Sequence, residues 1–271
     1  MKQITEIYQG LQQEIQEFPH RHSLPLVIAG KPAGFITAEA QHAIRHQPGI
    51  VITGTDVRIA TEDAPRNELD ALLAEVAALL HSANCAKAWR NELLPVYAND
   101  QDIAAIERAA VRPLGLLTRA VHLNAWTPDG KIFLAKRAST KSTDPGLWDT
   151  LVGGLANSSE QIEQALIRES DEEAGLDECD LQIRTPLRTI LRMHRRLPEG
   201  YQVEDILVSD CILLPETQPA NRDGEVSEIR IFGQEEVLDM IIDKTITTEA
   251  AIVLLEGLLN QPAQKLLHHL P

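Results

Sequence analysis

The sequence predicts an α/β protein made of two domains, and two observations support this. Apolar residues recur with helical spacing in some segments and with strand spacing in others along the whole chain of 271 residues. The pattern changes at Pro113: short strands and helices precede it, whereas longer strands follow it. We therefore expect an N-terminal α+β accessory domain at residues 1–113 and a larger domain at residues 114–271.

The first domain should begin with a helix at residues 4–18, because apolar side chains recur every three or four positions until Pro19. Two strand pairs should follow, turning near Gly30 and Gly54. Two further helices should complete the domain, the first with Pro65 in its opening turn. The strand pairs cover residues 24–37 and 50–61, and the helices cover residues 64–83 and 99–111.

The second domain should be richer in strands. Alternating apolar residues and turns near Gly130 and Gly200 predict two pairs of strands, with a loop and an acidic helix between the pairs. A further strand and two helices should end the chain. The strands cover residues 116–127, 131–138, 187–196, 202–214 and 227–233, and the last helices cover residues 234–242 and 247–260.

Composition argues against several classes of protein. A formal net charge of −15 disfavours binding to nucleic acid or to anionic membranes. The chain has no run of about 18 apolar residues, and its first residues are too polar for a secretory signal, so we expect a cytoplasmic protein. Cys85, Cys179 and Cys211 lack metal-binding spacing and are expected to be free thiols.

Residues 153–176 contain a helix crowded with carboxylates. Residues three and four apart share one face of a helix, so Glu169, Glu172 and Glu173 should project together. Close carboxylates repel one another unless a cation lies among them, and Mg²⁺ prefers such oxygen ligands, with Mn²⁺ as the alternative. A solvated acidic face is the other interpretation of this helix.

The spacing around this helix resembles the Nudix box, G-x5-E-x7-R-E-U-x-E-E-x-G-U, where U is a bulky apolar residue. Ser170 departs from it, because it stands where an apolar residue is usual. The fixed positions are filled by Gly154, Glu160, Arg168, Glu169, Glu172, Glu173, Gly175 and Leu176. The resemblance implies an α/β/α Nudix sandwich around a mixed β-sheet, with metal-dependent chemistry on a diphosphate.

Several residues of the box have expected structural roles. Gly153 and Gly154 should let the backbone bend sharply beside a ligand. Ser158 and Gln161 resemble a capping box that begins the helix, and Gly175 should end it in a left-handed conformation. We also expect an ion pair between Arg168 and Glu160, which would keep that glutamate ionised.

The residues before the box resemble two branches of the family. Type 1 isopentenyl diphosphate isomerase shares a pattern that Arg137, Lys141, Pro145 and Trp148 match, but it also needs a cysteine and a histidine shortly after the tryptophan, and this chain has neither there. Thiamine-diphosphate-related Nudix hydrolases of plants, fungi and bacteria fit better. They share the string at residues 134–154, a W-R-x-E element at Trp89, Arg90 and Glu92, and a D-G-E-V element at residues 223–226.

The resemblance implies a metal site on the acidic helix. Glu172 and Glu173 would be metal ligands, and Glu169 would be either a third ligand or the general base. Glu225 would add one acidic ligand from the region after the third long strand.

The resemblance also implies a substrate site, in which Arg137 and Lys141 bind the diphosphate near Gly153 and Gly154. Two solvated surface cations are the other interpretation of Arg137 and Lys141. The basic positions of the strand at residues 187–196 would either line an anionic pocket or be solvated, and no histidine is assigned a role. Those positions are Arg188, Arg192, His194 and Arg196.

The implied function is Mg²⁺-dependent hydrolysis of thiamine, oxythiamine or oxothiamine diphosphate to the monophosphate and phosphate. A general nucleoside-diphosphate-X hydrolase and an isomerase-like enzyme are the enzymatic alternatives, and a ligand-sensing Nudix domain is the non-enzymatic one. The extra domain would either cover the mouth of the active site or form a homodimer.

Overall fold

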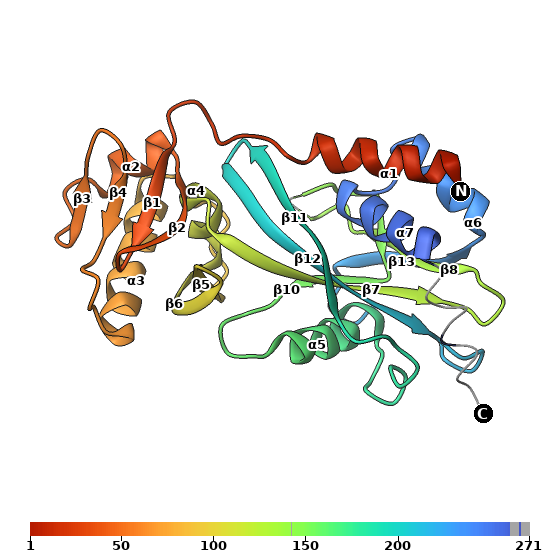
Figure 1. Ribbon diagram of the computed structural model, residues 1–271. Helices are drawn as coiled ribbons and strands as arrows, with labels where there is room; N and C mark the ends of the chain where they lie inside the picture. Colours follow the sequence, from red (N-terminus) through yellow and green to blue (C-terminus); the bar gives the residue numbers. More distant parts are fainter. Residues whose placement is uncertain (142, 261–265, 267–271) are drawn as a thin grey trace.

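The computed structural model describes residues 1–141, 143–260 and 266, and it contains two sheets and a separate hairpin (Figure 1). The N-terminal unit holds a four-stranded sheet in the order β2-β1-β4-β3 and the antiparallel hairpin β5–β6. Its strands are β1 (Leu24–Ile28), β2 (Lys31–Ile36), β3 (Ile50–Ile52), β4 (Val57–Ile59), β5 (Leu93–Ala98) and β6 (Gln101–Glu107). Its helices are α2 (Ala38–Ile44), α3 (Arg66–Ser82), the 3₁₀ turn η1 (Arg108–Ala110) and α4 (Val111–Leu114).

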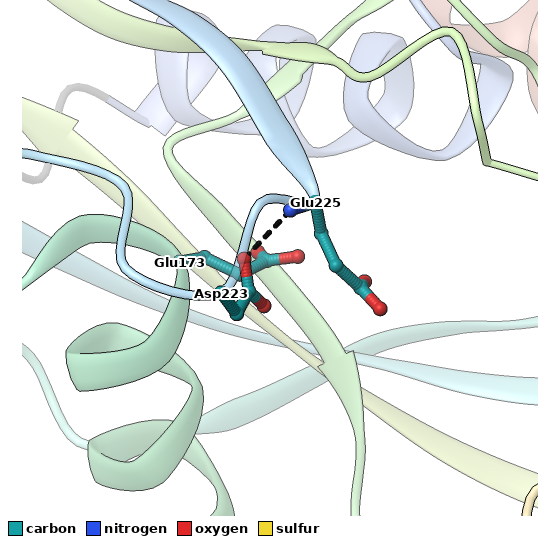
Figure 2. A group of neighbouring side chains, drawn as sticks. All are labelled: Glu173, Asp223 and Glu225. Atoms are coloured by element: carbon teal, nitrogen blue, oxygen red, sulfur yellow. Dashed lines mark hydrogen bonds between the residues drawn. The ribbon is translucent and has the colours of Figure 1, made fainter.

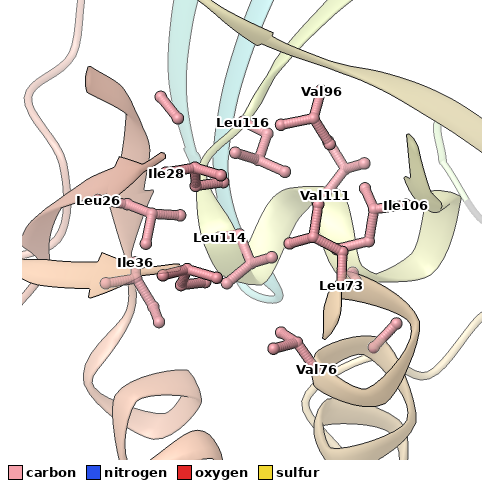
Figure 3. Packing of buried hydrophobic residues seen from close by; sticks show 14 of the residues in the cluster. Leu26, Ile28, Ile36, Leu73, Val76, Val96, Ile106, Val111, Leu114 and Leu116 are labelled. Carbon is pink, nitrogen blue, oxygen red and sulfur yellow. The ribbon is translucent and has the colours of Figure 1, made fainter. Parts of the chain in front are cut away.

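One apolar core holds this unit together. Side chains from the sheet, from α3 and from the β5–β6 hairpin converge around α4, as Figure 3 shows. Leu26, Leu73, Ile106 and Leu114 lie in this core and are almost completely buried. The predicted α+β character of the N-terminal region is therefore confirmed.

The predicted helix at residues 99–111 is wrong, because these residues form a turn, strand β6, the 3₁₀ turn η1 and the first residue of α4. Asn99 and Asp100 both adopt positive φ angles, 50° and 60°, which is the backbone of a tight hairpin turn. Asp70 on α3 then accepts the N–H of Ala105 at 2.8 Å and holds the hairpin against that helix. The helical spacing in this segment is overridden by pairing with β5.

The larger sheet is mixed. Its strands follow the order β11-β12-β7-β8-β13, with β10 paired to β7 and β9 paired to β8. β12 and β7 run parallel, whereas the other pairs in this sheet are antiparallel. The strands are β7 (Leu117–Trp126), β8 (Ile132–Arg137), β9 (Trp148–Thr150), β10 (Val152–Leu155), β11 (Arg188–Leu197), β12 (Gly200–Ile212) and β13 (Val226–Phe232).

Helices cover both faces of this sheet, which confirms the predicted α/β/α sandwich. α5 (Ile162–Ala174) packs on one face, while α7 (Thr248–Asn260) packs on the other, with α6 (Gln234–Ile242) beside it (Figure 1). Trp126 and Trp148 are buried in the core beneath α7. No helix among the described residues is long and apolar enough to cross a membrane.

The first helix, α1 (Lys2–Glu14), packs against α7 and not against the N-terminal unit (Figure 1). Its apolar side chains, including Ile4 and Leu11, join the core that contains Trp126. The division at residue 113 stays a prediction. Although α1 belongs to the first 113 residues, it packs against α7 of the larger domain.

Two helical glycines allow a test of the packing between α7 and the sheet. A methyl group added at Gly257 would overlap the Asn124 amide and press on the Trp126 ring, whereas the space around Gly10 of α1 is empty to 4 Å. We expect Gly257→Ala to lower the free energy of unfolding by about 1–2 kcal/mol. Gly10→Ala should raise it by up to about 1 kcal/mol, because alanine favours a helix. Denaturant unfolding would measure both, and a neutral Gly257→Ala would contradict the close packing.

Candidate active site

A cavity of about 350 Å³ lies where the N-terminal unit meets the larger sheet. Its walls come from the 90–112 segment, β7, β10, α5, the start of β12, and the loops before β9 and β13. The acidic helix therefore faces a cavity that both parts of the chain enclose. The N-terminal unit thus contributes to the cavity wall, and both roles predicted for it, as a cover or in a homodimer, stay predictions.

The N-cap of the acidic helix lies three residues after Ser158, the predicted N-cap. Gln161 is its N-cap, and the reciprocal hydrogen bonds join Gln161 and Gln164. The predicted box of Ser158 with Gln161 is wrong, because the Ser158 N–H donates to the Leu93 carbonyl at 2.8 Å. The predicted end is confirmed, since Gly175 has a left-handed φ of 64°.

Arg168 joins the carboxylates along one side of the cavity. It donates two hydrogen bonds to Glu160, at 2.7 and 3.0 Å, so the predicted pair is present. It also contacts Glu169 at 2.8 Å and Glu172 at 3.0 Å. Burial alone would raise the pKa of Glu160, but the hydrogen bonds from Arg168 and from the Asn157 N–H outweigh it and lower the pKa.

The two glycines of the box act through close packing rather than through a bend. Both lie in strand β10, paired with β7, and the predicted sharp turn is wrong. A side chain at Gly154 would overlap the Glu169 carboxylate. The Gly153 N–H donates to Glu173 at 2.9 Å. Glycine at position 154 therefore leaves the space that the Glu169 carboxylate occupies, and a side chain there would displace this carboxylate.

Three carboxylates come together beside the cavity. Oxygens of Glu173, Asp223 and Glu225 all lie within 4.8 Å of one another, as Figure 2 shows. The Glu225 N–H donates to Asp223 at 2.8 Å and fixes the loop before β13. Two of the four predicted metal ligands, Glu173 and Glu225, therefore lie together. Among the described residues, Glu169 and Glu172 lie outside this group and form ion pairs with Arg168 instead.

Lys141 places a positive charge among these carboxylates. Its ammonium lies 3.6 Å from Glu173 and also contacts Glu225. Burial raises the pKa of Glu173 to about 7, although Lys141 and the Gly153 N–H oppose that shift. Three carboxylates around one cation form an oxygen-only donor set, which fits a hard divalent ion.

Arg137 is held by protein acceptors on the cavity wall. It contacts Asp149 at 2.9 Å and the Thr143 carbonyl at 2.9 Å. Only 20% of the Arg137 side chain and 13% of the Lys141 side chain are exposed, so neither is a solvated surface cation. Their role on a diphosphate stays a prediction.

Asp223 and His122 are among the residues of the site that the sequence analysis did not assign. Asp223 stood inside the quoted D-G-E-V element, two positions before Glu225, and that spacing was an available signal. His122 on β7 is buried beside Gly153, where Nδ1 contacts Thr150 at 3.0 Å and Nε2 has no partner among the described residues. Burial lowers the pKa of His122, so its ring is neutral at pH 7. Only the pairing of β7 with β10 places this histidine in the cavity wall.

The basic residues that were predicted on one face of β11 do not line the cavity. They are Arg188, Arg192, His194 and Arg196. A bulge between Thr189 and Leu191 interrupts the predicted face. Arg195, from the alternate positions of the strand, lines the cavity instead. The three arginines of the predicted face are paired with carboxylates: Arg188 with Asp210 and Glu256, Arg192 with Asp100 and Asp205, and Arg196 with Glu17.

The chain is similar to several known proteins. A family model described as the NUDIX domain matches residues 116–251. Nudix hydrolase 24, chloroplastic, of Arabidopsis thaliana is 32% identical over 187 residues, which cover 66% of this chain and 50% of that protein. An uncharacterized protein of Saccharomyces cerevisiae is 25% identical over 227 residues, which cover 76% of this chain and 65% of that protein. A crystal structure from Deinococcus radiodurans has a TM-score of 0.48 and 22% identity, covering 61% of this chain and 98% of that chain.

The mixed sheet lies between helices, and a group of carboxylates stands at the end of α5, so the protein is an α/β sandwich with an acidic site. The family match covers half of the chain, and the chain belongs to the Nudix family. The chain spans 50% and 65% of the lengths of the two curated relatives.

Proposed function

We propose that this protein is a Mg²⁺-dependent hydrolase that cleaves the diphosphate of a thiamine-type substrate to the monophosphate and phosphate. The observation that carries the proposal is the group of Glu173, Asp223 and Glu225, of which Asp223 and Glu225 line the cavity. These three residues would hold Mg²⁺, or Mn²⁺ in its place. When bound, the ion supplies positive charge to the diphosphate oxygens and acidity to a coordinated water.

Glu169 is the residue that we propose as general base. Its carboxylate lies outside the group of three, against Gly154 and Arg168. Burial raises the pKa of Glu169 even though Arg168 opposes the shift. A carboxylate with a raised pKa is a stronger base towards an attacking water. This position supports the base role over the ligand role that the sequence left open.

The diphosphate would lie along Arg137 and Lys141. Both cations line the cavity beside the carboxylate group, and Arg137 presents a planar guanidinium suited to phosphate oxygens. Arg137 is already oriented by Asp149 and Thr143, so little side-chain freedom is lost on binding.

Support for a thiamine-type substrate comes from the motif strings and from polar residues of the cavity lining. These include Gln202, Glu249 and His122, whose Nε2 has no partner among the described residues. Such groups suit a nitrogen heterocycle with hydrogen-bonding edges better than an isoprenoid chain. Residues 149–154 also lack the cysteine and histidine that the isomerase needs.

The acidic group gives the first functional prediction. Glu173→Gln should remove nearly all turnover and leave the fold intact, because it removes a charged oxygen ligand without changing side-chain shape. Steady-state phosphate release in excess Mg²⁺ measures this. Glu163→Gln is the matched control, since Glu163 lies on the same helix but pairs with Arg184 outside the cavity. Wild-type kcat in Glu173→Gln would rule out a catalytic role for this helix face, and absence of turnover in the wild type would favour a ligand sensor.

The cations give the second prediction. Arg137→Ala and Lys141→Ala should each raise KM, because each loses a charge-assisted contact of about 1.5–3 kcal/mol. Lys131→Ala is the control, because Lys131 is exposed and pairs with Asp129 in the β7–β8 turn. Unchanged KM in both cavity variants would show that neither cation touches the diphosphate.

Substrate ranking tests the subfamily. Oxythiamine diphosphate carries an oxygen where thiamine diphosphate has an amino group, so a polar edge can discriminate between them. We expect a higher kcat/KM for oxythiamine diphosphate than for thiamine diphosphate, ADP-ribose or isopentenyl diphosphate, measured side by side with Mg²⁺. A nucleotide derivative that wins by tenfold, about 1.4 kcal/mol, would leave only the general hydrolase function.

A further inference from the structure

The W-R-N-E element of the N-terminal unit reaches the cavity through Arg90. Trp89 anchors this element, since its ring lies 5.0 Å from the His81 ring of α3 and its N–H donates to Asn91 at 2.9 Å. Glu107 accepts the Arg90 backbone N–H at 2.9 Å. One hydrogen bond therefore holds the Arg90 backbone, and the neighbouring Trp89 packs on α3, while the Arg90 side chain extends to Glu225 of the carboxylate group.

The side chain of Arg90 crosses from one part of the chain to the other. Its Nη1 lies 3.7 Å from Glu225 Oε1, and both side chains line the same cavity as Lys141. This contact is long for an ion pair, and both partners are partly exposed, at 39% and 37%. Such a pair adds little to stability. The Arg90 side chain is 39% exposed and lines the cavity, so its guanidinium is accessible to a ligand there.

We propose that Arg90 is a substrate-binding residue, whose guanidinium contacts the diphosphate once a divalent cation engages Glu225. The inference rests on the proposed function, because it assumes that a diphosphate binds beside the carboxylate group. A cation on Glu225 neutralises the charge that holds Arg90 in the free protein. The guanidinium then lies beside the bound anion, and its planar fork matches phosphate oxygens. The N-terminal unit is thus a wall of the active site that carries its own binding group.

An ion pair that only joins the two units predicts different behaviour. Loss of a purely structural arginine loosens the loop and the site together, so cation binding and anion binding both weaken. Loss of a substrate-binding arginine removes a positive charge beside Glu225, so Mg²⁺ binds the free protein at least as tightly as before. Anion binding alone becomes weaker.

The test compares Arg90→Ala and Arg90→Lys with Arg66→Ala in the full chain. Arg66 is the matched control, because it belongs to the same unit, is about half exposed and pairs with Asp102 away from the cavity. Calorimetric titration would give the Kd for Mg²⁺ alone and then the Kd for imidodiphosphate, a diphosphate that resists hydrolysis, at saturating Mg²⁺. Thermal melting would confirm that each variant is folded.

We expect the Kd of imidodiphosphate to rise about tenfold in Arg90→Ala and less in Arg90→Lys, with the Mg²⁺ Kd unchanged or lower. Arg66→Ala should match the wild type. Wild-type affinity for imidodiphosphate in both Arg90 variants would overturn this inference and leave the proposed function standing. Parallel loss of Mg²⁺ binding would also overturn it, in favour of a structural role. A wild-type protein that binds no imidodiphosphate with Mg²⁺ would overturn both.

Discussion

The site depends on the cost of burying the Glu173 carboxylate. A charged group removed from water is stable only if an opposite charge or hydrogen-bond donors compensate it. Here the Gly153 N–H donates to Glu173, and the Lys141 ammonium lies within 3.6 Å. Asp223 and Glu225 add further negative charge to the same place. The neighbourhood therefore favours a cation, and Lys141 is the cation that the chain itself provides.

The rest of the site positions the acidic helix relative to this group. Arg168 forms ion pairs with Glu160, Glu169 and Glu172, whereas Glu173 contacts Lys141. The negative charge of the helix is therefore divided between two cations, Arg168 and Lys141. Gly154 allows the helix to approach β10 so closely that the Glu169 carboxylate fills the space of a missing side chain. Because the two cations differ in burial and partners, carboxylates that are neighbours in sequence acquire different chemical environments.

Much of this arrangement was predictable from the sequence, because its causes are local. Resemblance to the box is enough to predict the pair of Arg168 with Glu160, which lies in the loop before α5, and the helix end, which depends on the single left-handed residue Gly175. The meeting of Glu173 with Glu225 was also predicted, although only by resemblance to the family.

The remainder depends on contacts between segments that are distant in sequence. The apolar spacing of residues 99–111 predicts a helix, but it suits strand β6 equally well, and only pairing with β5 decides between them. His122 enters the cavity wall through the register of β7 on β10, which no local pattern specifies. The contact of Arg90 with Glu225 joins positions that are 135 residues apart, as their numbers show, across two units.

A crystal structure with Mn²⁺ and imidodiphosphate would test the central claim most directly, because the anomalous signal of Mn²⁺ locates the cation without assumptions about activity. The account predicts a Mn²⁺ ion bound by oxygens of Glu173, Asp223 and Glu225, with the Lys141 ammonium displaced from among them towards the anion. An ion bound elsewhere, with Lys141 still between Glu173 and Glu225, would contradict it.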